Sequence, residues 1–398
     1  MFERLERLPT DPILGLMGLF RADSDARKVD LGVGVYRDDR GDTPILASVR
    51  RAEQSVLARQ TTKSYVAPAG NAGFNQAIER LVLGEGHPAL AADRVRSIQA
   101  PGGCGALRLG AELMRIAAPD TVVHVSTPTW ANHIPLLSGC GLKLERYPYY
   151  DAATGGVQFE ALLSALDQLP ARAVVLLHAC CHNPTGADLS ESQWRELLDL
   201  FRKRTLLPFI DLAYQGLGAG PIQDAFGIRL FAAELPEVAV AVSCSKNFGL
   251  YRERTGCLHV ICDSAKSGDA ALSQLVRIAR SIYSMPPDHG AAIVQEILGD
   301  ATLREQWADE VAGMRKRIAG LRRELVRRLA TACPQRDFGF IAAQRGMFSF
   351  LGVGITEVHE LRERHHVYMT DDSRINIAGL RAENLEYFAQ AVGQVLRK

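Results

Sequence analysis

The sequence lacks the features that mark several large classes of protein. Its 398 residues include 46 lysines and arginines against 45 aspartates and glutamates, so the net charge is only +1. A chain without excess positive charge has no broad attraction for nucleic acid or anionic membranes. Apolar runs such as AVVLLHACC have the length of a strand and fall far short of the roughly 20 residues of a spanning helix. We therefore expect neither nucleic acid nor a membrane as a partner.

The sequence also leads us to expect neither a secretion signal nor a cysteine framework. The first residues, MFERLERLPTD, mix both charge signs and contain no apolar stretch. The eight cysteines include no C-x-x-C pair, and the adjacent Cys180 and Cys181 do not have a framework spacing. Repeats and low-complexity tracts are also absent. We expect a cytoplasmic protein with an ordinary globular composition, 47% apolar and 23% charged.

Short apolar runs alternate with helical patterns between about residues 98 and 262. The runs cover residues 121–126, 173–178, 207–211, 238–243 and 257–262. Helical segments such as residues 192–204 separate them, with one apolar face. Runs that are apolar at both alternating positions are typical of strands covered on both sides. We therefore predict an α/β protein whose large domain has a mostly parallel sheet flanked by helices.

Apolar residues that recur every three or four positions predict one long helix over residues 303–331. A coiled coil is the alternative, but Gly313 and Gly320 inside the segment favour a helix packed on a core.

This helix is expected to link a large domain, residues 46–305, to a smaller α/β domain, residues 306–398. In the small domain, GMFSFLGV and RINIAGL have the pattern of strands. Roughly the first 40 residues show only strand and turn signals, and residues 1–45 precede the large domain. We expect an N-terminal arm that joins the small domain or reaches across to a partner.

Polar side chains follow four of the predicted strands at the point where each ends. In strand order they are Trp130 and His133; Asn183; Asp211 and Tyr214; and Ser243, Ser245, Lys246 and Arg254. Ligands of parallel α/β sheets bind outside the carboxyl ends of the strands. One such aspartate is often a helix cap, a lone lysine is usually solvated, and a lone tryptophan usually packs in a core. Four successive strand ends with different hydrogen-bonding groups indicate a binding site instead.

A glycine-rich turn, QAPGGCGALRLGAE, precedes a helix that we expect to begin near Ala106. Backbone N–H groups at such a turn can bind an anion, and the helix N-terminus favours negative charge. The turn is no dinucleotide fingerprint, because Arg108 stands where the third glycine would be, and no Walker A lysine follows. By itself it is either a phosphate cradle or simply a tight turn. Arg254, with Ser243 and Ser245, would supply further phosphate donors.

A lysine beside a phosphate site, an acid on the neighbouring strand and an aromatic face describe a site for pyridoxal phosphate. Lys246 would form a Schiff base with the cofactor aldehyde, which requires a neutral amine, and partial burial lowers its pKa. Asp211 would keep the pyridine nitrogen protonated so that the ring accepts electrons from the substrate. Trp130 would stack on the ring, while Asn183 and Tyr214 would hydrogen-bond its phenolic oxygen. Once displaced by substrate, Lys246 would carry a proton at the α-carbon.

The same segments belong to a wider set of motifs. They are SCSKNFGLYRERTG, HACCHNPTGADL, IDLAYQG, PTWANH, TTKSY, RSIYSMPP, RGMFSF and DPILGL. With them the chain closely resembles, from Asp11 to Gly379, the aspartate and aromatic amino-acid aminotransferases, which are class I pyridoxal-phosphate enzymes. The resemblance implies fold type I, a homodimer with shared active sites, and ping-pong transfer of an amino group to 2-oxoglutarate.

Matching positions imply further roles for residues of this chain. Phosphate would be bound by Ser243, Ser245, Arg254, the turn at Gly103 with Cys104, and Tyr65 of the other subunit. Arg374 would bind the substrate α-carboxylate, and Arg280 of the other subunit the distal carboxylate of an acidic substrate. Without the resemblance, both would be read as surface arginines.

Four more residues are expected around these contacts. Ile13 and Gly34 would line the substrate end of the site. His133 and His178 would lie behind the cofactor-contacting groups, although core histidines are the equal alternative. A metal bound by His178 and His182 is the less favoured interpretation, and we expect no metal.

Two departures from the family pattern stand out. Cys104 replaces the usual threonine or serine, which would weaken one phosphate contact modestly. Ser373 replaces a common glycine, and the added Asp371 and Asp372 would either compete for Arg374 or tune substrate preference.

The motifs point to more than one class of amino-acid substrate. Arg280 supports acidic substrates, whereas LPARAVVLLH, CCHNPTGADL and AYQGLGAG look more like the aromatic branch. We expect dual specificity with an aromatic bias, with a strict aspartate aminotransferase as the alternative. A different pyridoxal-phosphate reaction, such as decarboxylation or β-elimination, is a second possibility. A non-catalytic regulator on this fold is the most distant one, since no basic DNA-binding module is apparent.

Overall fold

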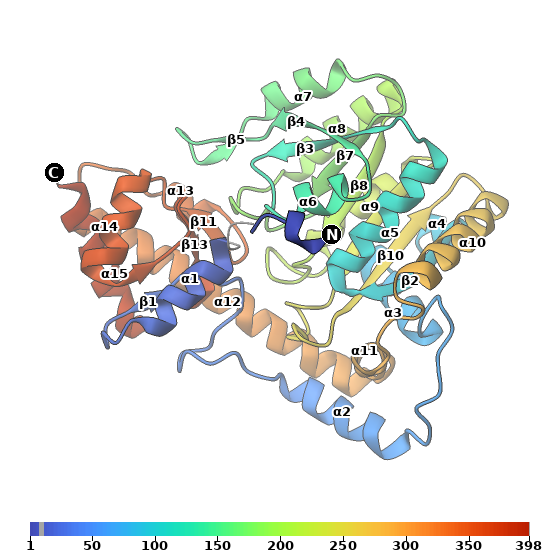
Figure 1. The fold of residues 1–398 in the computed structure, drawn as a ribbon, viewed down its shortest axis with the longest axis horizontal. Coiled ribbons are helices and arrows are strands. Elements are labelled where there is room, and N and C mark those ends of the chain that lie inside the picture. The colour runs from blue at the N-terminus through green and yellow to red at the C-terminus, as the bar shows by residue number, and fades with distance from the viewer. Residues whose placement is uncertain (8–11, 398) are drawn as a thin grey trace. The chain divides into compact units, whose positions relative to one another are not determined.

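A seven-stranded sheet forms the centre of the larger of two units in the computed structural model, which describes residues 1–7 and 12–397 (Figure 1). The larger unit comprises Pro44–Lys316 and Gln344–Gly346. The smaller comprises Met1–Thr43, Arg317–Ala343 and Met347–Lys398. Asp11, where the family resemblance begins, lies outside the described residues. The domain boundaries predicted from the sequence stay a prediction.

The sheet is mostly parallel, as predicted. Its strands are β2 (Val95–Pro101), β3 (Val122–Thr127), β4 (Lys143–Pro148), β7 (Val174–His178), β8 (Leu207–Leu212), β9 (Val238–Ser243) and β10 (Thr255–Ile261). They lie in the order β2-β10-β9-β8-β7-β3-β4. All pairs from β9 to β4 are parallel, whereas β10 runs antiparallel to both of its neighbours. The register places His178 beside Asp211 at the carboxyl ends of β7 and β8.

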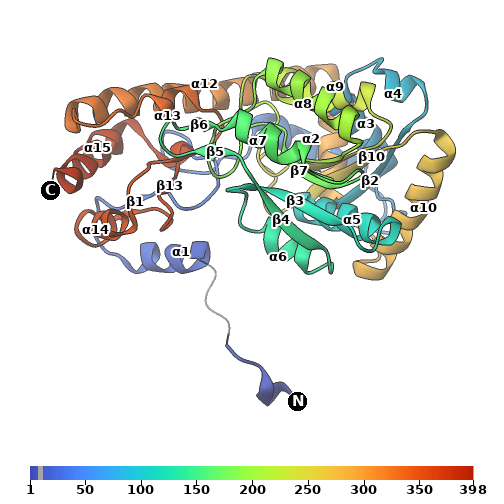
Figure 2. The same cartoon turned by 90° about the horizontal axis from the view of Figure 1, so that it is seen from above.

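Helices cover both faces of this sheet. They are α2 (Ala47–Arg59), α3 (Ala72–Leu83), α4 (Pro88–Ala91), α5 (Gly102–Ala117), α6 (His133–Ser138), α7 (Phe159–Asp167), α8 (Glu191–Arg204), η2 (Gln223–Ala225), α9 (Phe226–Glu234), α10 (Ala265–Ile282) and α11 (His289–Gly299). A small hairpin, β5 (Tyr150–Asp151) and β6 (Gly156–Val157), follows β4. Figure 2 shows α5 and α6 on one face of the sheet and α7, α8 and α9 on the other.

The helix expected at residues 192–204 is α8. Ser190 caps it through a reciprocal capping box with Gln193, which satisfies two N–H groups at the helix start. Its predicted apolar face, formed by Trp194, Leu197, Leu198 and Phe201, is buried.

The helix that follows the glycine-rich turn begins earlier than predicted. The helix α5 begins at Gly102 and not near Ala106. Gly102 has a φ of +70°, a backbone conformation that glycine adopts without strain. The chain can therefore turn from β2, which ends at Pro101, directly into the helix.

The smaller unit combines the two ends of the chain. Its elements are η1 (Phe2–Arg4), α1 (Pro12–Ala22), β1 (Val29–Asp30), α13 (Phe340–Ala343), β11 (Phe348–Phe350), α14 (Ile355–His365), β12 (Val367–Tyr368), β13 (Arg374–Asn376), η3 (Ile377–Gly379) and α15 (Ala382–Leu396). β1 pairs with β12 in parallel, and β11 pairs with β13 in antiparallel orientation. The prediction of only strand and turn structure in roughly the first 40 residues was wrong, because α1 is a helix of eleven residues.

One long helix, α12 (Ala301–Ala332), fills the span predicted as 303–331. The residues that predicted it are all buried: Leu303, Trp307, Val311, Met314, Ile318, Leu321, Leu325 and Leu329. The coiled-coil alternative is therefore not needed, since these side chains pack into the cores of the chain itself. No helix of the described residues is both long and apolar enough to cross a membrane.

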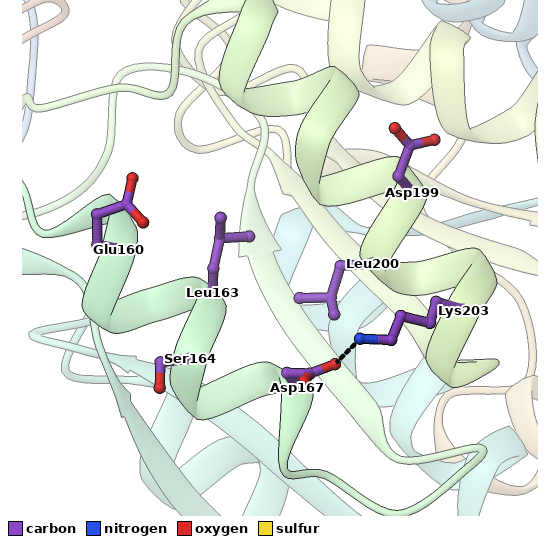
Figure 3. A pocket seen from close by; sticks show the side chains of 7 residues that line it. All are labelled: Glu160, Leu163, Ser164, Asp167, Asp199, Leu200 and Lys203. Carbon is purple, nitrogen blue, oxygen red and sulfur yellow. Dashed lines mark hydrogen bonds and ion pairs between the residues drawn. The ribbon is translucent and has the colours of Figure 1, made fainter.

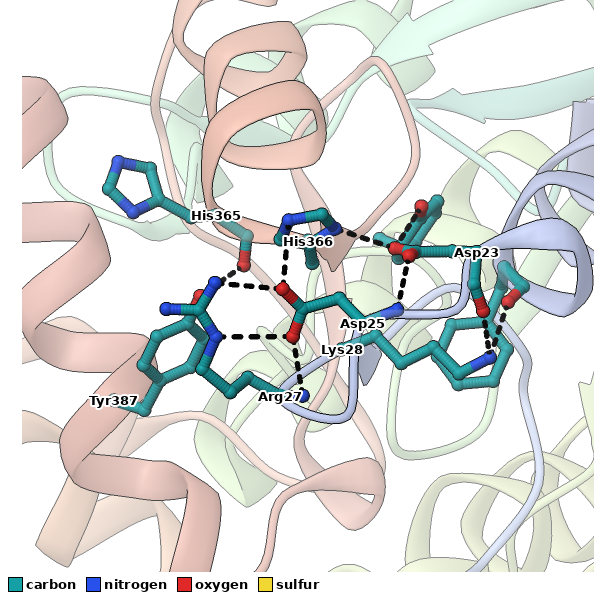
Figure 4. Close-up of polar contacts among 9 residues, drawn as sticks. Asp23, Asp25, Arg27, Lys28, His365, His366 and Tyr387 are labelled. Carbon is teal, nitrogen blue, oxygen red and sulfur yellow. Dashed lines mark hydrogen bonds and ion pairs between the residues drawn. The ribbon is translucent and has the colours of Figure 1, made fainter.

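A cluster of charged residues fastens the turn between α1 and β1 to β12 (Figure 4). The imidazole of His366 lies between Asp23 and Asp25, with Nδ1 2.7 Å from Oδ2 of Asp23 and Nε2 3.2 Å from Oδ2 of Asp25. The Tyr368 hydroxyl also donates to Asp23, at 2.7 Å, and Arg27 forks onto Asp25. The backbone N–H of Asp25 is the largest cause that lowers the pKa of Asp23 to about 2, followed by the Tyr368 hydroxyl.

Candidate functional site

The polar groups predicted at the strand ends converge at the carboxyl edge of the sheet in the larger unit. Lys246 lies three residues after the end of β9, is half-buried, and holds its Nζ 4.9 Å from the centre of the Tyr214 ring. Asp211 and Tyr214, at the end of β8, are both buried. Trp130 is half-buried and meets the edge of the His133 ring at 5.2 Å between ring centres. Asn183, after β7, is buried as well.

Burial and charge act on the Lys246 amine in opposite directions. Burial is the largest effect and lowers the pKa of Lys246 below its ordinary value of 10.5. Nearby Arg254 lowers it further, while Asp211 and Cys104 oppose that change. The net effect is a lowered pKa, which increases the fraction of neutral, nucleophilic amine.

Asp211 is held ionised by a buried histidine. Burial alone would raise the pKa of its carboxyl, but the hydrogen bond from His133, at 3.2 Å, together with the electrostatic influence of the neighbouring His133, His178 and Lys246, outweighs burial. The net result is a pKa below the ordinary 3.8. Thr129 Oγ1 joins His133 Nδ1, at 2.8 Å, to His178 Nε2, at 3.1 Å. His133 and His178 are thus linked to each other and to Asp211, and their place behind the cofactor-contacting groups stays a prediction.

Two further histidine contacts were not predicted. His182 is fully buried between Ser126 and Thr185, which contact its Nε2 at 3.2 Å and its Nδ1 at 2.9 Å. Its ring stacks on Tyr149, with 4.2 Å between centres and 13° between planes. Burial lowers the pKa of His178 to about 3 and that of His182 well below its ordinary value. Both rings are thus neutral and held by hydroxyl groups, an arrangement that no sequence spacing indicates.

Several hydrogen-bond donors gather at the start of α5. The N-cap residue is Pro101, whose ring offers no hydrogen-bond acceptor, so the first amide groups of the helix are not capped by it. A Cβ on Gly102 would collide with the Arg254 guanidinium, and a Cβ on Gly103 would lie 3.1 Å from that of Ser243. Arg254 Nη1 donates to Ser245 Oγ at 3.3 Å, and Ser243 Oγ accepts the Ser245 N–H at 3.2 Å. Amides, hydroxyls and one guanidinium therefore meet in one place, which suits a phosphate.

Cys104 stands in the first turn of α5. Its thiol is half-buried, and the Asn132 amide lies 3.7 Å from its Sγ. The side chain is therefore present at the corner that the sequence assigned to phosphate, but as a weak hydrogen-bonding partner.

Two predicted residues lie on the surface of the larger unit. Tyr65 is 91% exposed. Arg280, in the last turn of α10, is also exposed and its guanidinium donates to the Ser284 hydroxyl. Neither belongs to the buried or half-buried side chains described above around Lys246.

The remaining predicted residues lie in the smaller unit. Arg374 is buried at the start of β13, its Nη2 donates to the Gly32 carbonyl at 2.8 Å, and its guanidinium lies 4.6 Å above the Phe348 ring. A Cβ on Gly34 would come within 2.9 Å of Cζ of the same ring. Ile13 is half-buried in α1.

The aspartates next to Arg374 have partners of their own. Asp371 lies 3.2 Å from Nε2 of His359 and 3.3 Å from Nη1 of Arg362. Asp372 accepts from the Thr370 hydroxyl and from the backbone N–H of Arg374. Ser373 has a φ of +64°, a backbone conformation that glycine adopts more easily than serine.

A separate surface hollow between α7 and α8 has a different character. Its volume is about 460 Å³, and its lining includes Glu160, Asp167 and Asp199 (Figure 3). Lys203 pairs with Asp167 at 3.0 Å across it. None of the groups predicted to act in chemistry lines this hollow, so we assign it no role.

The known proteins that this chain resembles in sequence or structure are aminotransferases. The family model for class I and II aminotransferases matches residues 26–392. An aromatic-amino-acid aminotransferase of Pseudomonas aeruginosa is 49% identical over 394 residues, covering 99% of this chain and 98% of that protein. An aspartate aminotransferase of the same organism is 42% identical over 396 residues and covers both chains fully. A crystal structure of an aromatic-amino-acid aminotransferase from Burkholderia pseudomallei, covalently bound to pyridoxal phosphate, has a TM-score of 0.97 and 44% identity, and the match covers 100% of this chain and 99% of that one.

Proposed function

Because the chain belongs to the class I and II aminotransferases, we propose that it transfers the amino group of aromatic amino acids and of aspartate to 2-oxoglutarate. It is a pyridoxal-phosphate-dependent transaminase of amino acids. The observation that carries the proposal is the pairing of Lys246, whose amine has a lowered pKa, with Asp211, whose carboxyl stays ionised although it is buried. The named relatives include both aromatic and aspartate aminotransferases.

The residues present fit the cofactor. The uncapped start of α5, Ser243, Ser245 and Arg254 would bind the phosphate group, and the absence of a side chain on Gly103 leaves the amides open to it. Asp211, buried and ionised, would face the pyridine nitrogen. Bound there, pyridoxal phosphate supplies an electron-accepting ring that makes the α-proton of an attached amino acid acidic and stores the amino group.

The chain's own residues would bind, orient and move protons around that ring. Lys246 would hold the cofactor through its aldehyde carbon and, when displaced, would take and return the proton at the substrate α-carbon. Asp211 would keep a proton on the pyridine nitrogen. Trp130 would cover one face of the ring, while Asn183 and Tyr214 would bind its phenolic oxygen.

Substrate carboxylates would be bound by arginines. Arg374 would bind the α-carboxylate common to all amino acids, with Ile13 and Gly34 beside it. We infer a homodimer in the cytoplasm, in which the partner subunit's Tyr65 and the partner subunit's Arg280 complete the site. The exposure of both side chains in the single chain supports this inference.

Covalent labelling tests the cofactor site directly. Borohydride reduction of the purified holoenzyme followed by peptide mapping should fix the cofactor on Lys246 and not on Lys266, an exposed lysine of α10. A Lys246 peptide without label would overturn the proposed site.

Steady-state kinetics test the substrate class. We expect measurable kcat/KM for tyrosine, phenylalanine and aspartate with 2-oxoglutarate as acceptor. Replacing Arg280 by leucine should reduce kcat/KM for aspartate by about 100-fold or more and spare the aromatic donors, because only aspartate loses a charged partner. Arg277→Leu, on an exposed position of the same helix, is the matched control.

A strict aspartate aminotransferase is the second candidate. It is favoured by Arg280 and by the aspartate aminotransferase at 42% identity. A wild-type enzyme without activity toward either aromatic donor would decide for it.

A further inference from the structure

Arg322 is a fully buried arginine whose guanidinium binds the backbone of a short strand. It lies on α12 in the smaller unit and is only 2% exposed. Its Nη2 donates to the Phe348 carbonyl at 2.6 Å. Its Nη1 donates to the Ser349 hydroxyl at 2.6 Å and to the Ile341 carbonyl at 2.9 Å. A buried cation is costly unless it is well hydrogen-bonded, so these acceptors hold the guanidinium in a defined place.

The strand that Arg322 binds is short. β11 contains only Phe348, Ser349 and Phe350, and its sheet partner is the equally short β13. A pair of strands this short is marginal on its own. The guanidinium of Arg322 fixes two consecutive residues of β11 from the side of α12.

β11 in turn determines where the Arg374 guanidinium lies. Phe350 stands opposite Arg374 in the strand pair, and the Phe348 ring lies beneath its guanidinium at 4.6 Å. The same ring packs against Gly34, where a Cβ would come within 2.9 Å. The orientation of Arg374 therefore depends on a ring whose own backbone carbonyl is bound by Arg322.

We propose that Arg322 is a positioning residue for substrate binding. By holding the Phe348 carbonyl and the Ser349 hydroxyl it fixes the aromatic platform on which Arg374 rests. The inference depends on the proposed role of Arg374 as the α-carboxylate ligand. It follows that Arg322 sets the affinity for every amino-acid donor alike and has little effect on the chemical step.

Affinity for an unreactive monocarboxylate isolates the effect on Arg374. The probe is 3-phenylpropionate, titrated into the holoenzyme by calorimetry, because its single carboxylate has no distal group for Arg280. Arg322→Met should weaken binding about tenfold, and Arg322→Lys, which keeps the charge but loses the fork, should fall between. KM for tyrosine and aspartate should rise in parallel, with kcat within about twofold of the wild type.

Controls separate positioning from general loss of structure. Arg323→Met alters an exposed arginine on the next position of α12 and should leave affinity and Tm unchanged. Should Arg322→Met fail to fold, Ser349→Ala removes one acceptor only, and it should weaken binding in the same direction by about two- to threefold.

The outcomes also distinguish this inference from the proposed function. A folded Arg322→Lys or Ser349→Ala variant with a lower Tm but wild-type affinity and KM would reduce Arg322 to a structural role and overturn the inference. If Arg374→Lys also binds 3-phenylpropionate like the wild type, the role proposed for Arg374 fails instead. Weak binding by Arg374→Lys together with normal binding by the Arg322 variants rejects only the positioning role.

Discussion

The Nε2 atom of His133 lies 3.2 Å from Oδ2 of Asp211, and both side chains are buried. This hydrogen bond is the largest of the effects that lower the pKa of Asp211 against the opposing effect of burial. The ionised state of Asp211 therefore depends on the hydrogen bond from His133.

Replacing His133 by leucine should raise the pKa of Asp211, because burial is then less opposed. Asp211 acts in its ionised form, so the acid limb of the pH profile of kcat/KM should move to higher pH, and activity at pH 5 should fall more than at pH 8. His124→Leu is the control, since His124 is a buried histidine that faces Glu145. An acid limb that does not move in His133→Leu would contradict the role of His133.

Replacing Cys104 by threonine should tighten cofactor binding. A hydroxyl in place of the thiol adds one ordinary hydrogen bond, which contributes roughly 0.5–1.5 kcal/mol, so the Kd of pyridoxal phosphate should fall about two- to tenfold. The measurement is a fluorescence titration of the apoenzyme. Cys104→Ala should show no gain, and an unchanged Kd in Cys104→Thr would mean that the side chain does not contact phosphate.

Replacing Gly102 by alanine should weaken the phosphate corner. The φ of +70° disfavours a side chain, and the new Cβ would push the Arg254 guanidinium away. We expect the Kd of pyridoxal phosphate to rise about tenfold or more, together with a lower Tm. Gly299→Ala is a suitable comparison, because nothing lies within 4 Å of its would-be Cβ. Equal cofactor affinity in the two variants would argue against the corner.

Replacing Asp23 by asparagine should reduce stability in a pH-dependent manner. The pKa of Asp23 is lowered from 3.8 to about 2 in the folded chain, so its contribution is present above pH 4 and is lost as the pH falls toward 2. The Tm difference between wild type and variant should therefore be largest near pH 6 and shrink on acidification. Asp39→Asn, at an exposed aspartate, should show less change. A difference that grows as the pH falls would contradict this assignment.

Much of the larger unit was predictable because its strands are apolar on both sides. The segments 121–126, 173–178, 207–211 and 238–243 match β3, β7, β8 and β9 to within about a residue. β4 escaped prediction because KLERYP is an edge strand with exposed charges. The antiparallel direction of β10 was also not foreseen, since a local apolar pattern does not encode the direction of a strand.

The helix α1 was missed for a different reason. Its sequence, PILGLMGLFRA, contains Gly15 and Gly18, which have low helix propensity. Contacts made after folding decide its structure, and these are invisible in a local window.

Within the site, residues at strand ends were predictable, and the network behind them was only partly so. Lys246, Asp211 and Asn183 follow from position in the sheet and from the family motifs. Thr129, which joins His133 to His178, lies in a loop and carries no distinctive spacing. The roles proposed for Tyr65 and Arg280 came from the family motifs alone, because neither residue stands at a strand end of the predicted sheet.

The proline that precedes α5 has a consequence for the lifetime of the protein. Because Pro101 leaves the first amide groups of the helix without a cap, bound phosphate would accept their hydrogen bonds and so cap the start of the helix. A ligand that binds only the native state adds about 2.7 kcal/mol at a free concentration of one hundred times its Kd. Copies synthesised when pyridoxal phosphate is scarce would lack this stabilisation, so they should unfold more often and be degraded sooner.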